Sequence, residues 1–131
     1  ICSRDWSSDV CSSDLIVAHL VGDYITQSHW MATEKTKRSL AAGIHAVVYS
    51  VPFALITTNL IALAIIGGSH FLIDRYRLAR FVVWAKNGCK GPVTATGYPD
   101  DVPAWLSVWL LIIADNTLHI LINGLAIWWF A

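Results

Sequence analysis

The sequence predicts an all-α fold, in which a polytopic membrane protein forms a bundle of about four transmembrane helices. Hydrophobic residues make up 56% of the 131 residues and charged residues only 14%, and the mean hydropathy is +0.55. A soluble domain carries about 25% charged residues, so lipid is the better solvent for this chain. Several of the seven tryptophans stand at the ends of apolar runs, where they suit the headgroup region of a bilayer. The formal net charge of zero argues against a nucleic-acid partner.

The first fifteen residues, ICSRDWSSDVCSSDL, differ from the rest of the chain because they are polar and rich in Ser and Asp. They lack the basic segment and apolar run of a signal peptide. Residues 4–15 resemble the translation of a common sequencing-adapter oligonucleotide. We therefore expect residues 1–15 to be an artefactual, disordered leader, with a genuine disordered tail as the alternative. Residues 16–131 are expected to form the helical membrane domain.

The first two predicted helices cover residues 16–32 and 40–56. The first apolar run is close to the lower limit of roughly 17 residues for a membrane span. The second run continues without a charge over residues 40–66, which is too long for one span and too short for two independent ones. The polar triplet at 57–59 therefore predicts a turn, and Pro52 predicts a kink in the helix before it.

The last two predicted helices cover residues 60–84 and 105–130. Gly67 and Gly68 lie within the first of them, where small residues allow a neighbouring helix to approach closely. The segment 85–104 is dense in Gly and Pro and predicts a loop. The apolar run that follows is long enough to span a bilayer with some tilt.

Basic residues predict the orientation of the chain in the membrane. They gather in residues 33–39 and again between Arg75 and Lys90, whereas the turn at 57–59 has none. Because cytoplasmic loops carry the excess of Lys and Arg, we expect loops 33–39 and 85–104 to be cytoplasmic. The predicted location is a bacterial inner membrane, with both ends of the chain facing outward.

Three arginines lie close to the end of the third predicted helix, at positions 75, 77 and 80. Long basic side chains near helix ends extend to the membrane surface, and this is the expected role of all three. Basic residues at this face also attract anionic lipid headgroups, so headgroup binding is the alternative.

Ionisable residues inside the predicted helices follow a repeated spacing. Three helices contain a His and an Asp four residues apart, and the second helix adds one His: His19 with Asp23, His70 with Asp74, Asp115 with His119, and His45. Residues four apart lie on one face of a helix. Counted from the cytoplasmic helix ends at 1.5 Å per residue, all seven lie roughly 9–22 Å deep. Since ionisable residues within spans are costly and mark function, the sequence predicts one buried His/Asp cluster.

Imidazole and carboxylate groups suit zinc, manganese or iron, and carboxylates within a helical bundle can hold two metal ions. The expected metal ligands are His19, Asp23, His70, Asp74 and His119. Asp115 or His45 would complete the ligand shell or act as the catalytic base. A metal-bound water could then attack an ester or phosphoester. The hypothesis is a hydrolase that uses a divalent metal ion on a lipid-linked or amphipathic substrate.

Two other functions fit the same residues. His and Asp side chains also hydrogen-bond between membrane helices, and the chain would then be a non-enzymatic membrane protein, such as a phage accessory or structural factor. Chains of titratable groups also suit a small transporter or proton relay. Gln27, Asn116 and Asn123 could hydrogen-bond to ligating His residues, or they could serve helix packing alone.

Three segments carry a resemblance to one family: HLVGDYITQSHWMA (19–32), SHFLIDRYRLARFVVWAKN (69–87) and ATGYPDDVPAWLSVWLLIIADNTLHILIN (95–123). They resemble an uncharacterised family of small bacterial and phage-borne integral membrane proteins, classed as a domain of unknown function. The resemblance covers nearly everything after Leu15. It implies an integral membrane protein and assigns no reaction.

A second resemblance concerns the third predicted helix. Ser69 and His70 followed by Asp74 within an apolar helix are similar to a motif of the membrane-bound metal-dependent hydrolases. This resemblance implies that His70 and Asp74 are metal ligands. The other His-rich blocks of that family have no clear counterpart in this sequence.

Overall fold

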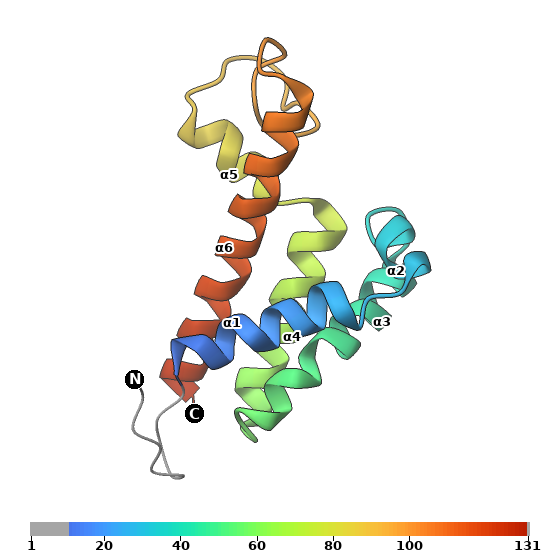
Figure 1. Cartoon of the computed structure of the whole chain (residues 1–131), viewed down its shortest axis with the longest axis vertical. Helices are drawn as coiled ribbons and strands as arrows, with labels where there is room; N and C mark the ends of the chain where they lie inside the picture. Colours follow the sequence, from blue (N-terminus) through green and yellow to red (C-terminus); the bar gives the residue numbers. More distant parts are fainter. Residues whose placement is uncertain (1–10, 131) are drawn as a thin grey trace.

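The computed structural model describes residues 11–130, which form helices, turns and loops and contain no strand. The α-helices are α1 (Ser12–Leu20), α2 (His29–Glu34), α3 (Ser39–Ser50), α4 (Leu60–Tyr76), α5 (Ala79–Lys86) and α6 (Ala104–Phe130). The predicted all-α fold class is confirmed for this part of the chain. Helices α1, α3, α4 and α6 form one bundle, whereas α5 and the loop before α6 lie beyond it, against the first half of α6 (Figure 1).

The helical part begins earlier than the sequence predicts. Residues 1–10 of the predicted leader lie outside the described residues, as does residue 131. Helix α1, however, starts at Ser12, and the side chain of Leu15 packs against the apolar core. Residues 12–15 of the predicted leader are thus helical in the structure, and the boundary of the leader at residue 15 stays a prediction.

The predicted helix over residues 16–32 is interrupted. Helix α1 continues into a π-helical turn over Val21–Ile25, in which the Thr26 N–H donates to the Val21 carbonyl at 3.0 Å. Helix α2 starts afresh after Ser28, whose hydroxyl accepts a hydrogen bond from the Met31 N–H. π-helical turns occur frequently at functional sites. Here the turn contains Asp23, which is buried.

Pro52 and Asn59 define the connection between α3 and α4. A 3₁₀ turn over Pro52–Leu55 follows α3, because proline lacks the N–H that would continue the α-helix. The side-chain oxygen of Asn59 then accepts hydrogen bonds from the N–H groups of Ile61 and Ala62 and caps the start of α4.

The predicted helix over residues 60–84 is two helices. Helix α4 ends at Tyr76, and Arg77 adopts the left-handed conformation with φ of 53°. The Leu78 N–H donates to the Ile73 carbonyl at 2.9 Å, which closes the helix end. Glycine usually occupies such a position. The sequence pattern misses this break because neither Gly nor Pro marks it.

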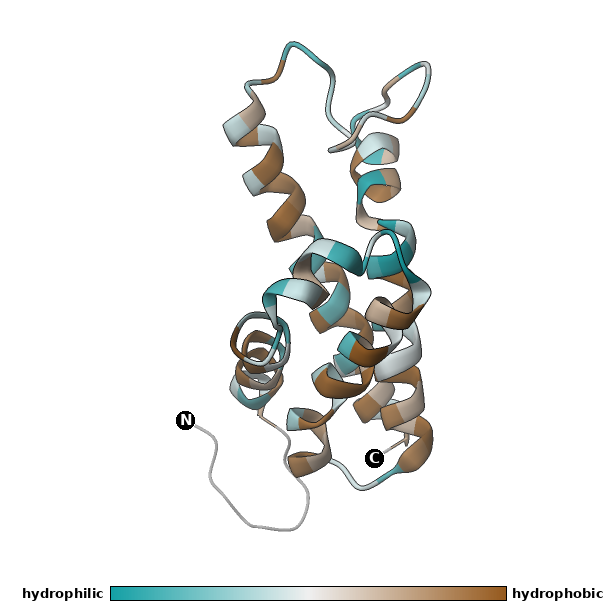
Figure 2. Ribbon diagram, turned by 90° about the vertical axis from the view of Figure 1, so that its right-hand side faces the viewer, coloured by the Kyte–Doolittle hydropathy of each residue, from teal (hydrophilic) through white to brown (hydrophobic). Residues whose placement is uncertain are grey.

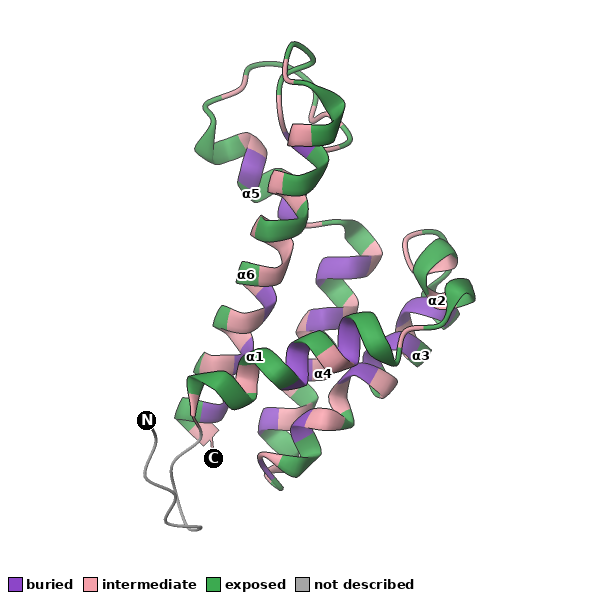
Figure 3. Cartoon of the chain, viewed as in Figure 1, coloured by how far each residue is buried: buried purple, intermediate pink, exposed green. Residues whose placement is uncertain are grey.

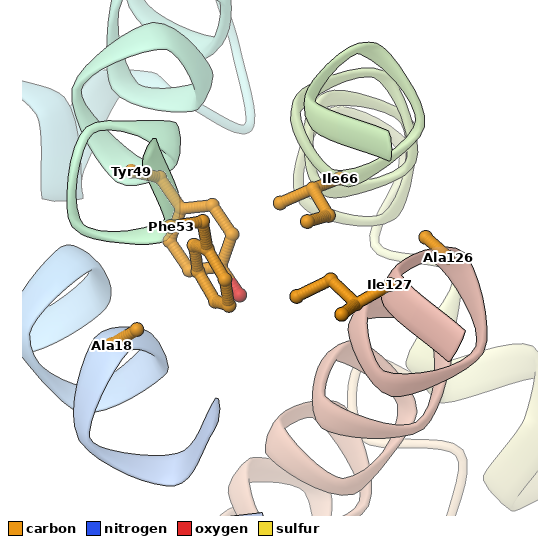
Figure 4. Packing of buried hydrophobic residues seen from close by; sticks show 6 residues of the cluster. All are labelled: Ala18, Tyr49, Phe53, Ile66, Ala126 and Ile127. Atoms are coloured by element: carbon orange, nitrogen blue, oxygen red, sulfur yellow. The ribbon is translucent and has the colours of Figure 1, made fainter. Parts of the chain in front are cut away.

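A small apolar core holds one end of the bundle together. Figure 4 shows side chains from α1, α3, the turn after α3, α4 and α6 that meet there: Ala18, Tyr49, Phe53, Ile66, Ala126 and Ile127. Buried positions lie on the helix faces that meet one another, and exposed positions lie outside (Figure 3). The polar interior described below lies next to this core, and Tyr49 contributes to both.

The outer surface of the helices is apolar. Figure 2 shows hydrophobic residues along most turns of the helices, and large side chains such as Leu40, Leu60 and Ile113 are exposed. Among the described residues, α6 with its 27 residues is the one helix long and apolar enough to cross a membrane, and Ser39–Leu55 is a shorter apolar helix.

Gly22 allows the π-helical turn to contact α3. A Cβ at this position would lie 2.8 Å from Tyr49 Cδ2 and 2.9 Å from the Tyr49 carbonyl oxygen, and backbone cannot easily move aside. We predict that Gly22→Ala lowers the free energy of unfolding by about 1–3 kcal/mol, measured by thermal unfolding in detergent.

The matched control is Gly43→Ala in α3. A Cβ at position 43 meets nothing within 4 Å in the described structure, and alanine favours a helix over glycine. This variant should be neutral or slightly stabilised. An equal loss of stability in both variants would contradict the close approach at Gly22.

Candidate functional site

Ionisable side chains from several helices meet inside the bundle, next to the apolar core. The π-helical turn provides Asp23, α3 provides His45, α4 provides His70 and Asp74, and α6 provides His119. Each of these residues is at most 6% exposed. Charged groups removed from water in this way must be compensated by opposite charge, hydrogen bonds or a metal ion.

A first group consists of Asp23, His45, His70 and Asp74. The Nε2 atom of His45 lies 3.1 Å from Asp23 Oδ1 and 3.3 Å from Asp74 Oδ2. The Nε2 atom of His70 lies 2.9 Å from His45 Nε2, 3.1 Å from Asp74 Oδ2 and 3.9 Å from Asp23 Oδ1. All four ligand atoms lie within 4.8 Å of one another. Four buried side chains thus converge on one point.

The spacing of these atoms fits a metal ion. Bonds of about 2.0–2.2 Å place neighbouring ligand atoms roughly 3.0 Å apart in an octahedron and roughly 3.4 Å apart in a tetrahedron. The distances above, 2.9–3.9 Å, bracket these values. Within the described part of the chain, Asp74 Oδ2 is buried and makes no well-aligned hydrogen bond, although ionic groups surround it. The four residues therefore form a buried group that could hold a metal ion.

Asp74 also belongs to a second group. Its Oδ1 atom lies 3.6 Å from His119 Nε2, which in turn lies 3.5 Å from Asp115 Oδ2. His119 Nε2 is buried and has no hydrogen-bond partner among the described residues. The Nδ1 atoms of His119 and His70 are 3.2 Å apart and connect the two groups. Asp74, Asp115 and His119 are a second set that could hold a metal ion.

His19 lies beside these groups and outside both of them. Its Nδ1 atom is 2.8 Å from the Tyr49 hydroxyl, and its Nε2 atom is 3.0 Å from Asn116 Oδ1. Its ring also stacks on that of His119, with 5.8 Å between ring centroids. The structure therefore brings six of the seven predicted site residues into the two groups and places His19 as a hydrogen-bonding neighbour.

Sequence reasoning did not select Tyr49. Its hydroxyl accepts a hydrogen bond from Asn123 Nδ2 at 2.6 Å, and its ring stacks on His70 with 3.6 Å between centroids. Tyr49 thus holds the rings of both His19 and His70. The available signal was its position four residues after His45, which places both on one face of α3.

Lys35 is the second residue that sequence reasoning assigned elsewhere, to a cytoplasmic loop. Its Nζ atom lies 2.8 Å from Asp74 Oδ2, 3.4 Å from Asp23 Oδ1 and 3.3 Å from His45 Nε2. Burial alone would lower the pKa of Lys35, but the charges of Asp74 and Asp23 outweigh it and raise the pKa above its ordinary value of 10.5. The sequence offered one indication of this role: the predicted buried carboxylates need a compensating cation, and Lys35 is a basic residue close to Asp23 in the chain.

A cavity of about 230 Å³ lies next to both groups. Carboxylates, cations and apolar side chains share its lining, which includes Asp23, Asp74, Asp115, Lys35, Arg77, Arg80, Ile73, Leu111 and Ile112. A small molecule, or part of a larger one, can therefore reach the ionisable groups.

The fold and this site define an all-helical protein whose interior carries His and Asp groups that could hold a metal ion. A family model described as "Protein of unknown function (DUF3307)" matches residues 13–122, and the chain belongs to this family. The predicted membership of a family of unknown function is thereby confirmed. No curated protein and no solved structure matches the chain.

We predict that Lys35→Met lowers the free energy of unfolding by about 3 kcal/mol, because Asp23 and Asp74 lose their compensating charge. The pKa of Lys35 is raised on folding, so its contribution is fully present below the unfolded pKa and is lost only as the pH rises through the folded pKa. Lys35 therefore stays charged in the folded protein at about pH 8, where the loss is measured by thermal unfolding with metal chelated.

The matched control is Lys37→Met. The Lys37 side chain is 66% exposed and pairs with Glu34, and exposed pairs of this kind stabilise little. An equal effect of both substitutions would mean that Lys35 does not compensate the buried carboxylates.

Proposed function

We propose that this chain is a multi-pass membrane protein that binds a divalent metal ion and uses it to hydrolyse a lipid-linked or amphipathic substrate. The observation that carries the proposal is the convergence of Asp23, His45, His70 and Asp74 on one buried point. The neighbouring cavity provides access for the substrate.

Helix α6 supports a location in the membrane. Exposed tryptophans stand near both of its ends, Trp105 and Trp109 at one and Trp128 and Trp129 at the other. The rise of 1.5 Å per residue separates the two pairs by roughly 30 Å, which matches the hydrocarbon thickness of a bilayer. Tryptophan favours the two membrane interfaces.

Further helices support a multi-pass arrangement. Helix α4 has 17 residues, and the apolar segment Ser39–Leu55 has the same length, which is near the lower limit of roughly 17 residues for a span. Their outer faces expose large apolar side chains, such as Leu40, Val47 and Leu72. Soluble monomers rarely expose extended apolar patches, whereas lipid would cover them.

The ligand types support zinc, manganese or iron as the metal, since all three accept imidazole and carboxylate ligands. A bound metal ion would polarise the substrate and supply a hydroxide at neutral pH. Zinc sites with four protein ligands are typically structural and have no open position. Hydrolysis therefore favours manganese or iron, which accept more ligands and leave room for water and substrate.

His119 and Asp115 are the proposed proton acceptors. His119 Nε2 faces one oxygen of Asp74 and one of Asp115, and Asp115 lines the cavity. A proton released by a water molecule could pass to this pair. His45 fits the role of ligand better than that of base, because its Nε2 atom contacts both Asp23 and Asp74.

One observation favours a second candidate function, a polar core that fixes the register of the helices. The ammonium group of Lys35 already contacts one oxygen of each buried carboxylate and can neutralise the site without a metal ion. A metal ion would compete with Lys35 for the same oxygens. The two functions therefore differ in the metal content that they predict.

We predict that protein purified in detergent contains near-stoichiometric manganese, iron or zinc, and that His70→Ala and Asp74→Ala lose it while remaining helical. The reason is that each substitution removes a ligand from the first group. The measurement is elemental analysis by mass spectrometry, with circular dichroism to monitor folding.

His29→Ala is the matched control, because His29 is exposed at the start of α2. This variant should keep its metal. Two results would contradict the metal site: wild-type protein without metal after incubation with all three ions, or equal metal content in every variant. Either would favour the second candidate function, a polar core that fixes the register of the helices.

A further inference from the structure

Two arginines, Arg77 and Arg80, also line the cavity beside the two groups. We propose that this cavity binds the phosphate group of an amphipathic ligand, with Arg77 and Arg80 as its anion-binding side chains. The inference rests on the proposed function, because a metal ion at the carboxylates makes the cavity attractive to an anion. It adds the class of substrate to the proposed hydrolysis.

Arg80 has unused hydrogen-bonding capacity at the cavity. Its Nε atom is buried and finds no acceptor within residues 11–130, while its guanidinium lies 4.8 Å from the ring of Phe81. Buried donors in folded proteins are almost always paired.

Arg77 also has N–H donors beyond the one that it uses within the protein. One of its terminal nitrogens donates to the Ala95 carbonyl at 3.0 Å, and a guanidinium carries five N–H donors. Arg77 also adopts the left-handed conformation, with φ of 53°. Strained backbone of this kind is concentrated at functional sites, and here it places an arginine where a glycine would usually end the helix.

The loop before α6 holds both arginines in position. Ala95 accepts the hydrogen bond from Arg77, and Gly97 packs so closely on α5 that a Cβ there would collide with the Arg80 carbonyl oxygen. Thr94 fixes the loop, because its Oγ1 donates to the Tyr98 carbonyl at 2.8 Å and accepts from the Gly97 N–H at 3.0 Å. The loop thus contacts the side chain of Arg77 and the backbone of Arg80.

The charges of the cavity select an anion once a metal ion is bound. Among the described residues, its lining includes three cations (Lys35, Arg77 and Arg80) and three carboxylates (Asp23, Asp74 and Asp115). A divalent cation added to this balanced set leaves an excess of two positive charges. A phosphate group carries a matching negative charge, and the planar fork of arginine fits its oxygens.

The rest of the lining indicates an amphipathic ligand. Ile73, Leu111 and Ile112 form apolar parts of the wall, and the next residue of α6, Ile113, is an exposed apolar side chain. A volume of about 230 Å³ lies below the usual range of roughly 300–1,000 Å³ for pockets that enclose a whole ligand. The cavity therefore suits a headgroup whose apolar part lies outside it.

Isothermal titration calorimetry on Mn²⁺-loaded protein in detergent tests the proposal. The probes are dioctanoyl phosphatidic acid and inorganic phosphate, with dioctanoylglycerol as the ligand without phosphate. We expect binding of phosphatidic acid that Arg77→Gln and Arg80→Gln each weaken by about 10-fold or more. Arg80→Lys should restore part of the loss, because it keeps the charge and loses the fork.

Arg38→Gln is the matched control, because the Arg38 side chain is 69% exposed and pairs with Glu34. Arginine-dependent binding of phosphatidic acid alone supports a lipid headgroup as the ligand, and arginine-dependent binding of inorganic phosphate as well supports free phosphate. Binding of neither probe, equal binding of dioctanoylglycerol, or equal weakening by Arg38→Gln would overturn the proposal.

The metal content of the same samples separates this inference from the proposed function. Metal-loaded protein without arginine-dependent phosphate binding would overturn the inference and leave the metal site standing. Protein that takes up no metal would overturn the proposed function, and the inference with it.

Discussion

Two carboxylates, Asp23 and Asp74, are buried inside an apolar bundle, and the arrangement of the surrounding helices compensates their charge. Each is close to fully buried, and a buried charge without a partner costs several kcal/mol. The imidazoles of His45 and His70 and the ammonium of Lys35 surround their oxygens. Helices α3 and α4 and the segment around α2 are thereby held together by charge as well as by apolar contact.

Two backbone irregularities lie beside this polar interior. The π-helical turn at Val21–Ile25 contains Asp23, and the left-handed residue Arg77 ends α4 just after Asp74. The first irregularity lies at the carboxylate itself, and the second separates the ligand-bearing helix from α5 and directs the chain along the cavity wall. The apolar core has an irregularity of its own, because Phe53 lies in the 3₁₀ turn over Pro52–Leu55.

The sequence predicts some of this arrangement and misses the rest for physical reasons. Composition is sufficient for the all-α class, and the four-residue spacing of His70 and Asp74 shows that they share a helix face. Spacing within a helix cannot show which faces meet, so the separate environment of His19 was not predictable. The break at Arg77 has no glycine to mark it. The role of Lys35 depends on how the segment around α2 packs on the bundle. The sequence does not distinguish a loop lysine that faces water from one that pairs with a buried carboxylate.

X-ray absorption spectroscopy of the metal-loaded protein tests whether Asp23, His45, His70 and Asp74 bind the metal ion, because it reports the atoms bound to the ion. A metal ion held by the first group would have nitrogen and oxygen ligands at about 2.0–2.2 Å, with the outer-shell scattering of two imidazoles from His45 and His70. With four protein ligands, hydrolysis requires a coordination number above four, since water must also bind the ion. A spectrum with sulfur ligands, or with oxygen ligands and no imidazole, would contradict a metal site at these four residues.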